Sequence, residues 1–241
     1  VVQFVFDKIG IKKGKMTSGI NVLVTAGSTV EYIDSVRILT NLSSGKMGLN
    51  LAQQCLDKCF NVTFVYGHGS LNIPDDPRMN IIRIKTTEEM LKVVKERILN
   101  EKQHIVFHVA AVADFSILHS SKKRPNKMDT RNGTKTIKLV PTTKIVDKIK
   151  QFDNKIFLVA FKAEYGISKE LLVKRALAKL NECNGDLIVA NDVSRKGCDF
   201  GSDTNEVYII DKEKDMIHIP LESKKEIARN LLKIVCKKLK I

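Results

Sequence analysis

The sequence predicts an α/β protein with a doubly wound, Rossmann-like, mostly parallel sheet that ends in a C-terminal hairpin and helix. Three observations lead to this fold class. Continuously apolar segments of strand length alternate with amphipathic segments of helix length along most of the 241 residues. Small and polar residues follow several of the apolar segments, as at the carboxyl ends of buried parallel strands. Near the C-terminus only a short polar turn separates two strand-like segments, which predicts an antiparallel pair.

In the first half of the chain, each element is predicted from its own pattern. The first strand, 22–26, is an apolar run that ends at Gly27 and suits burial on both faces of a sheet. The first helix, 44–59, carries an apolar stripe that includes Met47, Leu51 and Cys55. A capping box opens the second helix at Thr86. Further strands are expected over 61–66, 80–84 and 104–109.

In the second half, the segment 115–133 is polar, basic and without a period, so it is predicted to be a mobile loop that covers a charged ligand. Pro141 is expected to start a helix that runs to residue 150, and Ser223 is expected to cap the last helix. The remaining expectations are strands over 135–140, 156–161 and 186–190, a helix over 167–181, and a hairpin of 206–211 with 216–219.

The charge of the chain indicates a polyanionic ligand. The formal net charge is +14, and the segment 122–150 holds ten Lys and Arg residues against Asp129 and Asp147. A nucleic-acid-binding module is the obvious alternative, but this basic segment has no aromatic residue on which a base could stack, and the chain has no Trp. No apolar run approaches the roughly 18 residues that a membrane span needs, so neither a nucleic-acid nor a membrane partner is expected.

Residues 1–19 are expected to be a linker or the tail of a preceding domain, and residues 20–241 to form the functional domain. The five cysteines form no C-x-x-C pair. With no signal peptide, this pattern predicts reduced thiols and a cytoplasmic location.

Known nucleotide-binding fingerprints are absent from the loops. Gly27, Ser28 and Thr29 stand where a dinucleotide fold places its phosphate loop, but the G-x-G-x-x-G pattern is missing. The second strand ends at Tyr66-Gly67 without the acid that would hold a ribose hydroxyl, and Gly45-Lys46 lacks the rest of a Walker motif. An NAD-dependent oxidoreductase and a P-loop enzyme are therefore disfavoured. The histidines have no metal-ligand spacing, so neither a structural metal nor a histidine base is predicted.

The segment 41–48 is predicted to be the anion site. It joins a polar loop to a helix start, where unpaired N–H groups and the positive end of the helix dipole point outward. Simpler interpretations stay open: Ser43 and Ser44 as helix caps, Asn41 as a turn residue and Asp114 as a strand-end cap.

Taken together, the motifs resemble phosphopantothenate cysteine ligase over about residues 21–240. This family joins 4'-phosphopantothenate to cysteine through an acyl nucleotide in coenzyme A synthesis. The resemblance implies CTP as co-substrate (ATP in the eukaryotic branch), Mg2+, a homodimer, and a fused N-terminal flavin-dependent decarboxylase. The segments that carry it are Val24-Thr25-Ala26-Gly27-x-Thr29, Ile33-Asp34-x-Val36-Arg37, Thr40-Asn41-x-Ser43-Ser44-Gly45-Lys46-Met47-Gly48, Ala110-Ala111-Val112-Ala113-Asp114, Ala190-Asn191-Asp192 and Phe200-Gly201-Ser202-Asp203-Thr204-Asn205-Glu206.

The resemblance also implies roles for individual residues. Asn41 would be catalytic, holding the acyl nucleotide and the developing oxyanion. Asp114 would meet ribose or the metal ion. The implied substrate- and nucleotide-binding residues are Gly27, Ser28, Thr29, Arg37, Ser43, Ser44, Gly45, Lys46, Ala111, Val112, Ala113, Asp114, Phe161, Lys162, Asn191 and Phe200.

One segment departs from the family pattern. The family supplies a lysine from a Lys-Ile-Lys-Lys sequence about ten residues after the motif aspartate, where this chain has Arg124-Pro125-Asn126-Lys127. Either Arg124 substitutes for that lysine, or Lys127 or one of its neighbours Lys122 and Lys123 takes the role. An NAD(P)-dependent oxidoreductase and a basic nucleic-acid-binding module are retained as alternative functions.

Overall fold

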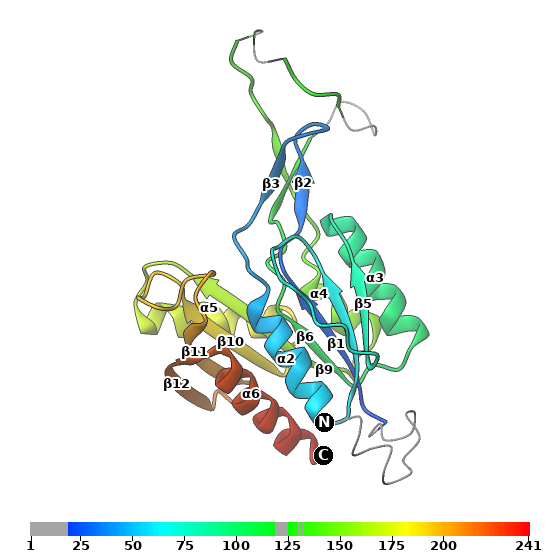
Figure 1. Ribbon diagram of the computed structural model, residues 1–241. Coiled ribbons are helices and arrows are strands. Elements are labelled where there is room, and N and C mark those ends of the chain that lie inside the picture. The colour runs from blue at the N-terminus through cyan, green and yellow to red at the C-terminus, as the bar shows by residue number, and fades with distance from the viewer. Residues whose placement is uncertain (1–18, 119–124, 130, 132) are drawn as a thin grey trace.

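The computed structural model describes residues 19–118, 125–129, 131 and 133–241, and one eight-stranded sheet forms its centre (Figure 1). The strand order is β12-β11-β10-β9-β6-β1-β4-β5, in which all neighbours from β10 to β5 run parallel and β11 and β12 are antiparallel. The strands are β1 (Asn21–Ala26), β4 (Asn61–Tyr66), β5 (Met79–Arg83), β6 (Ile105–His108), β9 (Phe157–Glu164), β10 (Leu187–Asp192), β11 (Thr204–Asp211) and β12 (Met216–Ser223).

The helices cover both faces of the sheet, which explains why its central strands are apolar throughout. Helices α2 (Lys46–Asp57) and α6 (Lys224–Leu239) pack together on one face (Figure 1). The other face packs against α3 (Thr87–Asn100), α4 (Val146–Phe152) and α5 (Lys169–Glu182). Val22, Leu23 and Val24 are fully buried, as expected for a strand between two helical layers. The predicted doubly wound fold with its C-terminal hairpin and helix is thus confirmed.

The strand order reverses between β1 and β6. From β1 the chain moves outward to β4 and β5, and then returns through β6 to the other side of β1 before reaching β9 and β10. The loops that leave the carboxyl ends of β1 and β6 therefore diverge. In open α/β sheets, such a switch point is where ligands bind.

Two small antiparallel ribbons project from the carboxyl edge of the sheet (Figure 1). The first consists of β2 (Val30–Tyr32) and β3 (Ile38–Thr40), and the second of β7 (Phe115–Ile117) and β8 (Leu139–Pro141). A Ser116 hydroxyl joins the ribbons by donating to Glu31 Oε2 at 2.7 Å.

The ribbons correct three predictions. The segments 27–43 and 115–133 contain strands where only loops were expected, because three-residue strands are too short to show a period. The strand predicted over 135–140 is limited to β8 at its end. Pro141 closes β8 rather than starting a helix, and α4 begins only at Val146.

Candidate active site

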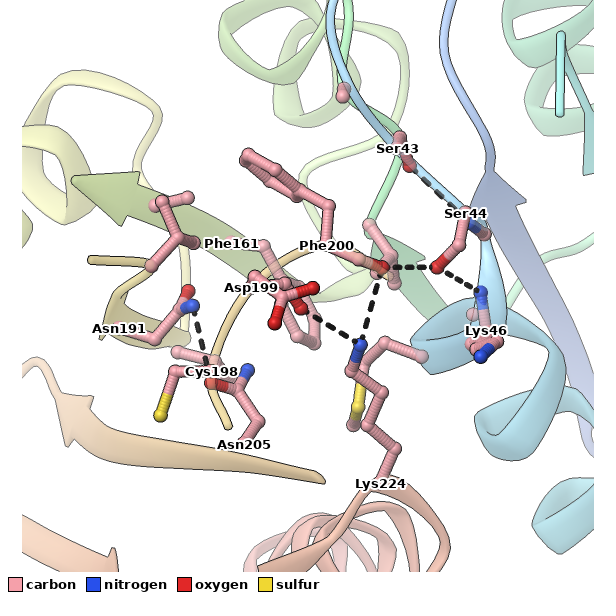
Figure 2. A pocket seen from close by; sticks show the side chains of 18 of the residues that line it. Ser43, Ser44, Lys46, Phe161, Asn191, Cys198, Asp199, Phe200, Asn205 and Lys224 are labelled. Atoms are coloured by element: carbon pink, nitrogen blue, oxygen red, sulfur yellow. Dashed lines mark hydrogen bonds between the residues drawn. The ribbon is translucent and has the colours of Figure 1, made fainter. Parts of the chain in front are cut away.

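A cleft opens at the switch point, between the first turns of α2 and α6 and the carboxyl ends of β6, β9 and β10 (Figure 2). Its volume of about 160 Å³ is below the roughly 300–1,000 Å³ of pockets for drug-sized ligands, so it suits one arm of a larger substrate. Its lining includes Ser43, Ser44, Gly45, Lys46, Ala111, Phe161, Ala163, Asn191, Cys198, Asp199, Phe200, Asn205 and Lys224.

The start of α2 forms one wall of this cleft. The helix begins at Lys46 after Gly45, which has a φ of 76° and is the N-cap, so neither predicted serine is the N-cap residue. Ser43 Oγ accepts a bond from Gly45 N at 3.3 Å, and Ser44 Oγ accepts one from Lys46 N at 3.5 Å. Both hydroxyls are thus turned toward the free N–H groups of the helix start, where an anion would also be stabilised.

A glycine brings this helix start close to the sheet. A side chain on Gly48 would place its Cβ 2.5 Å from Ala26 Cβ. Because real Cβ atoms do not approach so closely, only glycine lets the first turn of α2 lie directly over the end of β1. The anion site and the switch point therefore share one location.

The loop 199–203 forms the opposite wall and carries Phe200. Its main chain is held to α2 at two points: Ser44 Oγ donates to Phe200 O at 2.5 Å, and Lys46 Nζ donates to Gly201 O at 2.7 Å. Lys46 also pairs with Asp203 at 2.7 Å. An ammonium group has three donors, so Lys46 keeps one for a ligand.

Asn41 lies beside this cleft, although the structure does not place it among the lining residues. It stands two residues before Ser43, and its Nδ2 donates to Val112 O at 3.0 Å. The side chain is exposed. Asn41 thus connects the segment before α2 to the segment after β6, and its amide is accessible to a ligand.

The segment 110–114 is held in place by the protein's own hydrogen bonds. Ala111 N donates to Gly27 O at 2.9 Å, and Ala113 N donates to Thr29 Oγ1 at 2.8 Å. Their N–H groups are therefore occupied, whereas each carbonyl retains acceptor capacity in its second lone pair. These carbonyls are therefore the acceptors that the segment offers to a ligand.

Thr29 and Ser28 are structural in this arrangement. Thr29 is fully buried, and its hydroxyl also bonds Thr87 Oγ1 at 2.9 Å. Ser28 is 1% exposed; its main chain pairs with His68, and its Oγ accepts from Thr40 Oγ1 at 2.9 Å. Both residues are therefore buried beneath the loop after β1 and hold its conformation.

His108 supports the same loop from inside the protein. Its Nδ1 lies 3.0 Å from Thr25 Oγ1, which also accepts a bond from Ala110 N at 3.3 Å. Burial lowers the pKa of His108 to about 4. The imidazole is therefore neutral at pH 7 and shares a hydrogen bond with the Thr25 hydroxyl.

Arg37 is placed in the β2–β3 turn and not in the cleft. Its guanidinium pairs with Asp34 and approaches Met128 O at 3.4 Å. Burial alone would raise the pKa of Asp34, but N–H donors from Val36, Arg37 and Met128, together with the Arg37 guanidinium, hold it well below its ordinary value. The segment 125–129 is thereby tied to the first ribbon, with Lys127 exposed beside Met128. Arg124 lies outside the described residues.

Lys162 faces away from the cleft. Its neighbours Phe161 and Ala163 line the cleft, and side chains alternate along a strand, so Lys162 belongs to the opposite face. There it lies 3.2 Å from Glu164, which also pairs with Arg175.

Asp114 is exposed at the carboxyl edge and pairs with Lys144. Within the described ranges, no group of three or more His, Cys, Asp or Glu side chains could hold a metal ion. A Mg2+ ion that arrives on a triphosphate needs only one or two protein carboxylates. Asp114 can supply one such carboxylate if its partner Lys144 pairs with the phosphates instead.

Three residues of the site were missed from the sequence. Lys224 is buried in the cleft wall, Asn205 accepts a bond from Asn191 Nδ2 at 3.3 Å, and Asp199 Oδ1 accepts bonds from Gly201 N and Ser202 N. Asn205 stood in a quoted motif, but Lys224 had only a helix-start pattern. The contacts of Asp199 are a local turn, which an Asp followed by Gly and Ser two and three residues later could have indicated, whereas the contacts of Lys224 and Asn205 in the cleft have no local signal.

The fold and the cleft define the class of protein as an α/β protein with a candidate ligand site at the switch point of its sheet. Residues 17–239 match the family described as DNA/pantothenate metabolism flavoprotein C-terminal domain, and the chain belongs to that family. The structure describes no helix long and apolar enough to cross a membrane.

Known relatives agree with this assignment. The chain is 36% identical over 234 residues to the coenzyme A biosynthesis bifunctional protein CoaBC of Thermococcus kodakarensis, covering 96% of this chain and 54% of that protein. The crystal structure of the C-terminal domain of a CoaBC protein is 31% identical with a TM-score of 0.74, covering 93% of this chain and 97% of the other. The flavoprotein of that family from Streptococcus pneumoniae is 25% identical with a TM-score of 0.79, covering 91% and 99%.

Proposed function

We propose that this chain is a carbon–nitrogen ligase that joins 4'-phosphopantothenate to cysteine in coenzyme A synthesis. CTP activates the carboxylate, an acyl-cytidylate forms, and pyrophosphate is released. The observation that carries the proposal is the family match over residues 17–239, with a CoaBC relative 36% identical over 96% of the chain. The position of Asn41 between the start of α2 and the segment after β6 supports it.

In the first step, a carboxylate oxygen attacks the α-phosphorus of CTP and pyrophosphate leaves. Because the carboxylate is already ionised, this step needs positioning and charge neutralisation rather than a base. The start of α2 and the remaining donor of Lys46 would stabilise anionic oxygens. A cation from the segment that contains Arg124 and Lys127 would add to this, supplied by one of these two residues.

In the second step, the cysteine nitrogen attacks the acyl carbon, CMP leaves, and the nitrogen loses a proton. The developing oxyanion needs a donor that carries no negative charge. One N–H of the Asn41 amide donates to Val112 O, and the other is available for the oxyanion. A neutral amide suits this role, whereas a carboxylate would repel the charge.

The nucleotide is proposed to bind over the segment 111–113 as its Mg2+ complex, with Asp114 toward the metal ion or the ribose. The amino group of cytosine would donate to a main-chain carbonyl of this segment. Adenine also has an exocyclic amino group, so these carbonyls alone do not discriminate against ATP.

A homodimer is proposed as the working form. Several large apolar side chains are exposed on and around the two ribbons, and exposed apolar residues gathered on neighbouring elements are typical of an association site. They are Val36 at 64%, Ile38 at 37%, Phe115 at 49%, Leu118 at 52%, Ile137 at 40% and Leu139 at 47%.

Two assays separate this function from its alternatives. A thermal-shift screen with CTP, ATP and NADP distinguishes the ligase from an NAD(P)-dependent oxidoreductase: CTP is expected to stabilise the chain and NADP is not. A gel shift with DNA and RNA at rising salt tests the nucleic-acid-binding alternative, for which salt-sensitive binding would be required.

A further inference from the structure

Lys224 is a buried lysine in the cleft wall that the ligation chemistry above does not use. It is the first residue of α6, next to the N-cap Ser223, and is only 5% exposed. Figure 2 shows its side chain rising from α6 toward the loop that carries Phe200. A lysine is rarely buried without partners, so its contacts indicate what it does.

The partners of Lys224 are main-chain carbonyls of the loop 199–203. Its Nζ donates closely to Ser202 O and over longer distances to Phe200 O, at 3.4 Å, and Asp199 O, at 3.5 Å. Its main-chain N–H donates to Asp203 O at 2.8 Å. Since an ammonium group has three donors, these carbonyls saturate Lys224 and leave none for a substrate.

This saturation separates Lys224 from Lys46. Lys46 is bound to two acceptors, Gly201 O and Asp203 Oδ1, and its side chain is 34% exposed. Both lysines therefore hold the same loop, but only Lys46 retains a donor for a ligand.

The carbonyl of Phe200 is the point where the two helices meet the loop. It accepts from Ser44 Oγ at the start of α2 and from Lys224 Nζ at the start of α6 (Figure 2). Two donors on one carbonyl fix the orientation of that peptide, and hence the direction in which the Phe200 ring leaves the main chain. Burial and the nearby charge of Lys46 lower the pKa of Lys224, with Asp199 and Asp203 opposing them. The close contact with Ser202 O requires a donor in either protonation state of the lysine.

We propose that Lys224 is a positioning residue whose ammonium group acts as an internal cation for the loop 199–203 and sets Phe200 as a wall of the substrate cleft. It would act on substrate affinity through Phe200 and not on the reacting atoms. The effect on catalysis rests on the proposed function, whereas the effect on the loop does not.

The test compares Lys224→Met with Lys225→Met. Methionine keeps the length and apolar stem of lysine but has no donor, and Lys225 is the exposed neighbour on the same helix. We expect Lys224→Met to speed amide hydrogen exchange in 199–203 by at least about tenfold in the ligand-free protein. In the ligation assay it should raise KM for one substrate by about tenfold or more, with a smaller change in kcat. Lys225→Met should match the wild type in both.

A rescue experiment guards against simple misfolding. Lys224→Ala should recover part of the lost KM when n-butylammonium is added, because that ion can occupy the space and donate to the same carbonyls. The KM of Lys224→Arg should lie between those of the wild type and Lys224→Met.

An amide exchange rate in 199–203 that is unchanged in Lys224→Met would overturn the proposal. Slow exchange elsewhere in that variant would show that it is folded. An inactive wild type would instead count against the ligase function, while hydrogen exchange still decided the role of Lys224.

Discussion

Asn41 is the residue on which the proposed chemistry depends most. We expect Asn41→Ala to lower kcat by about 100-fold or more, since loss of one oxyanion donor typically costs 10² to 10³. The side chain is exposed, and among the described residues its hydrogen bond is to Val112 O, so the melting temperature should stay within a few degrees of the wild type. Steady-state ligation and thermal unfolding measure the two quantities.

An isosteric control sharpens this prediction. Asn41→Asp keeps the size of the side chain but places a negative charge where an oxyanion forms, so it should be at least as inactive as Asn41→Ala. Wild-type turnover in either variant would remove Asn41 from the mechanism.

Single residues could be assigned from the sequence where their motif included their partners. The serines and glycines before α2 belong to one short segment, and the structure keeps them together in the cleft wall. Arg37 was assigned to phosphate binding by the resemblance, but in the structure its guanidinium pairs with Asp34 of the same motif. Lys224 is explained only by contacts with residues 199–203, a long-range arrangement that no local pattern encodes.

At the scale of elements, the carboxyl end of β6 contains a buried histidine that makes stability depend on pH. The His108 pKa is lowered from 6.5 to about 4 by burial, so between these values the unfolded chain binds the additional proton. Stability is therefore expected to fall as the pH is lowered from about 6.5 to 4. His108 should contribute about 3 kcal/mol to this change in the free energy of unfolding, since one pKa unit corresponds to about 1.4 kcal/mol.

Urea unfolding of the wild type and of His108→Gln at several pH values measures this contribution. Glutamine can still hydrogen-bond to Thr25 but does not titrate. The free energy of unfolding of the variant should therefore change less with pH between pH 4 and 6.5 than that of the wild type. Equal slopes in both proteins would show that His108 is not the group responsible.

Elements could be predicted from the sequence where they are long and periodic. The strands of the main sheet and helices α2, α3, α5 and α6 were expected within a few residues of their observed bounds. The two ribbons were not expected, because their strands have three residues each and, for β7 and β8, pair across more than twenty residues of sequence. Helix α4 was placed too early because Pro141 ends a strand, a position that its fixed φ also permits.

At the scale of the whole molecule, the exposed apolar side chains of the ribbons predict association of two chains. Sedimentation velocity should give a species of twice the 27.1 kDa chain mass. Val36→Glu should weaken association by at least about tenfold, because it would bury a charge at the interface. Tyr165→Glu is the control, since Tyr165 is 77% exposed and lies away from the ribbons, between β9 and α5. A wild type that stays monomeric at micromolar concentration would contradict the proposed dimer.

The overall architecture was predictable because the hydrophobic pattern of each main element agrees with the sheet that they form together. The net charge of +14 predicted an anionic ligand but gave no location for it. The segment 41–48 was the predicted location, but the loops that lie beside it follow from the strand order, which places the divergent loops after β1 and β6 at one point of the carboxyl edge. Strand order depends on the packing of the whole chain and could not be derived from any one segment.

The most direct test of the account is a ligation assay of this chain with 4'-phosphopantothenate, cysteine and Mg2+, with CTP compared with ATP. Product should form only when a nucleotide is present, with one pyrophosphate released per amide bond, and CTP should give the higher kcat/KM. A folded chain that forms no amide with either nucleotide would contradict the proposed function.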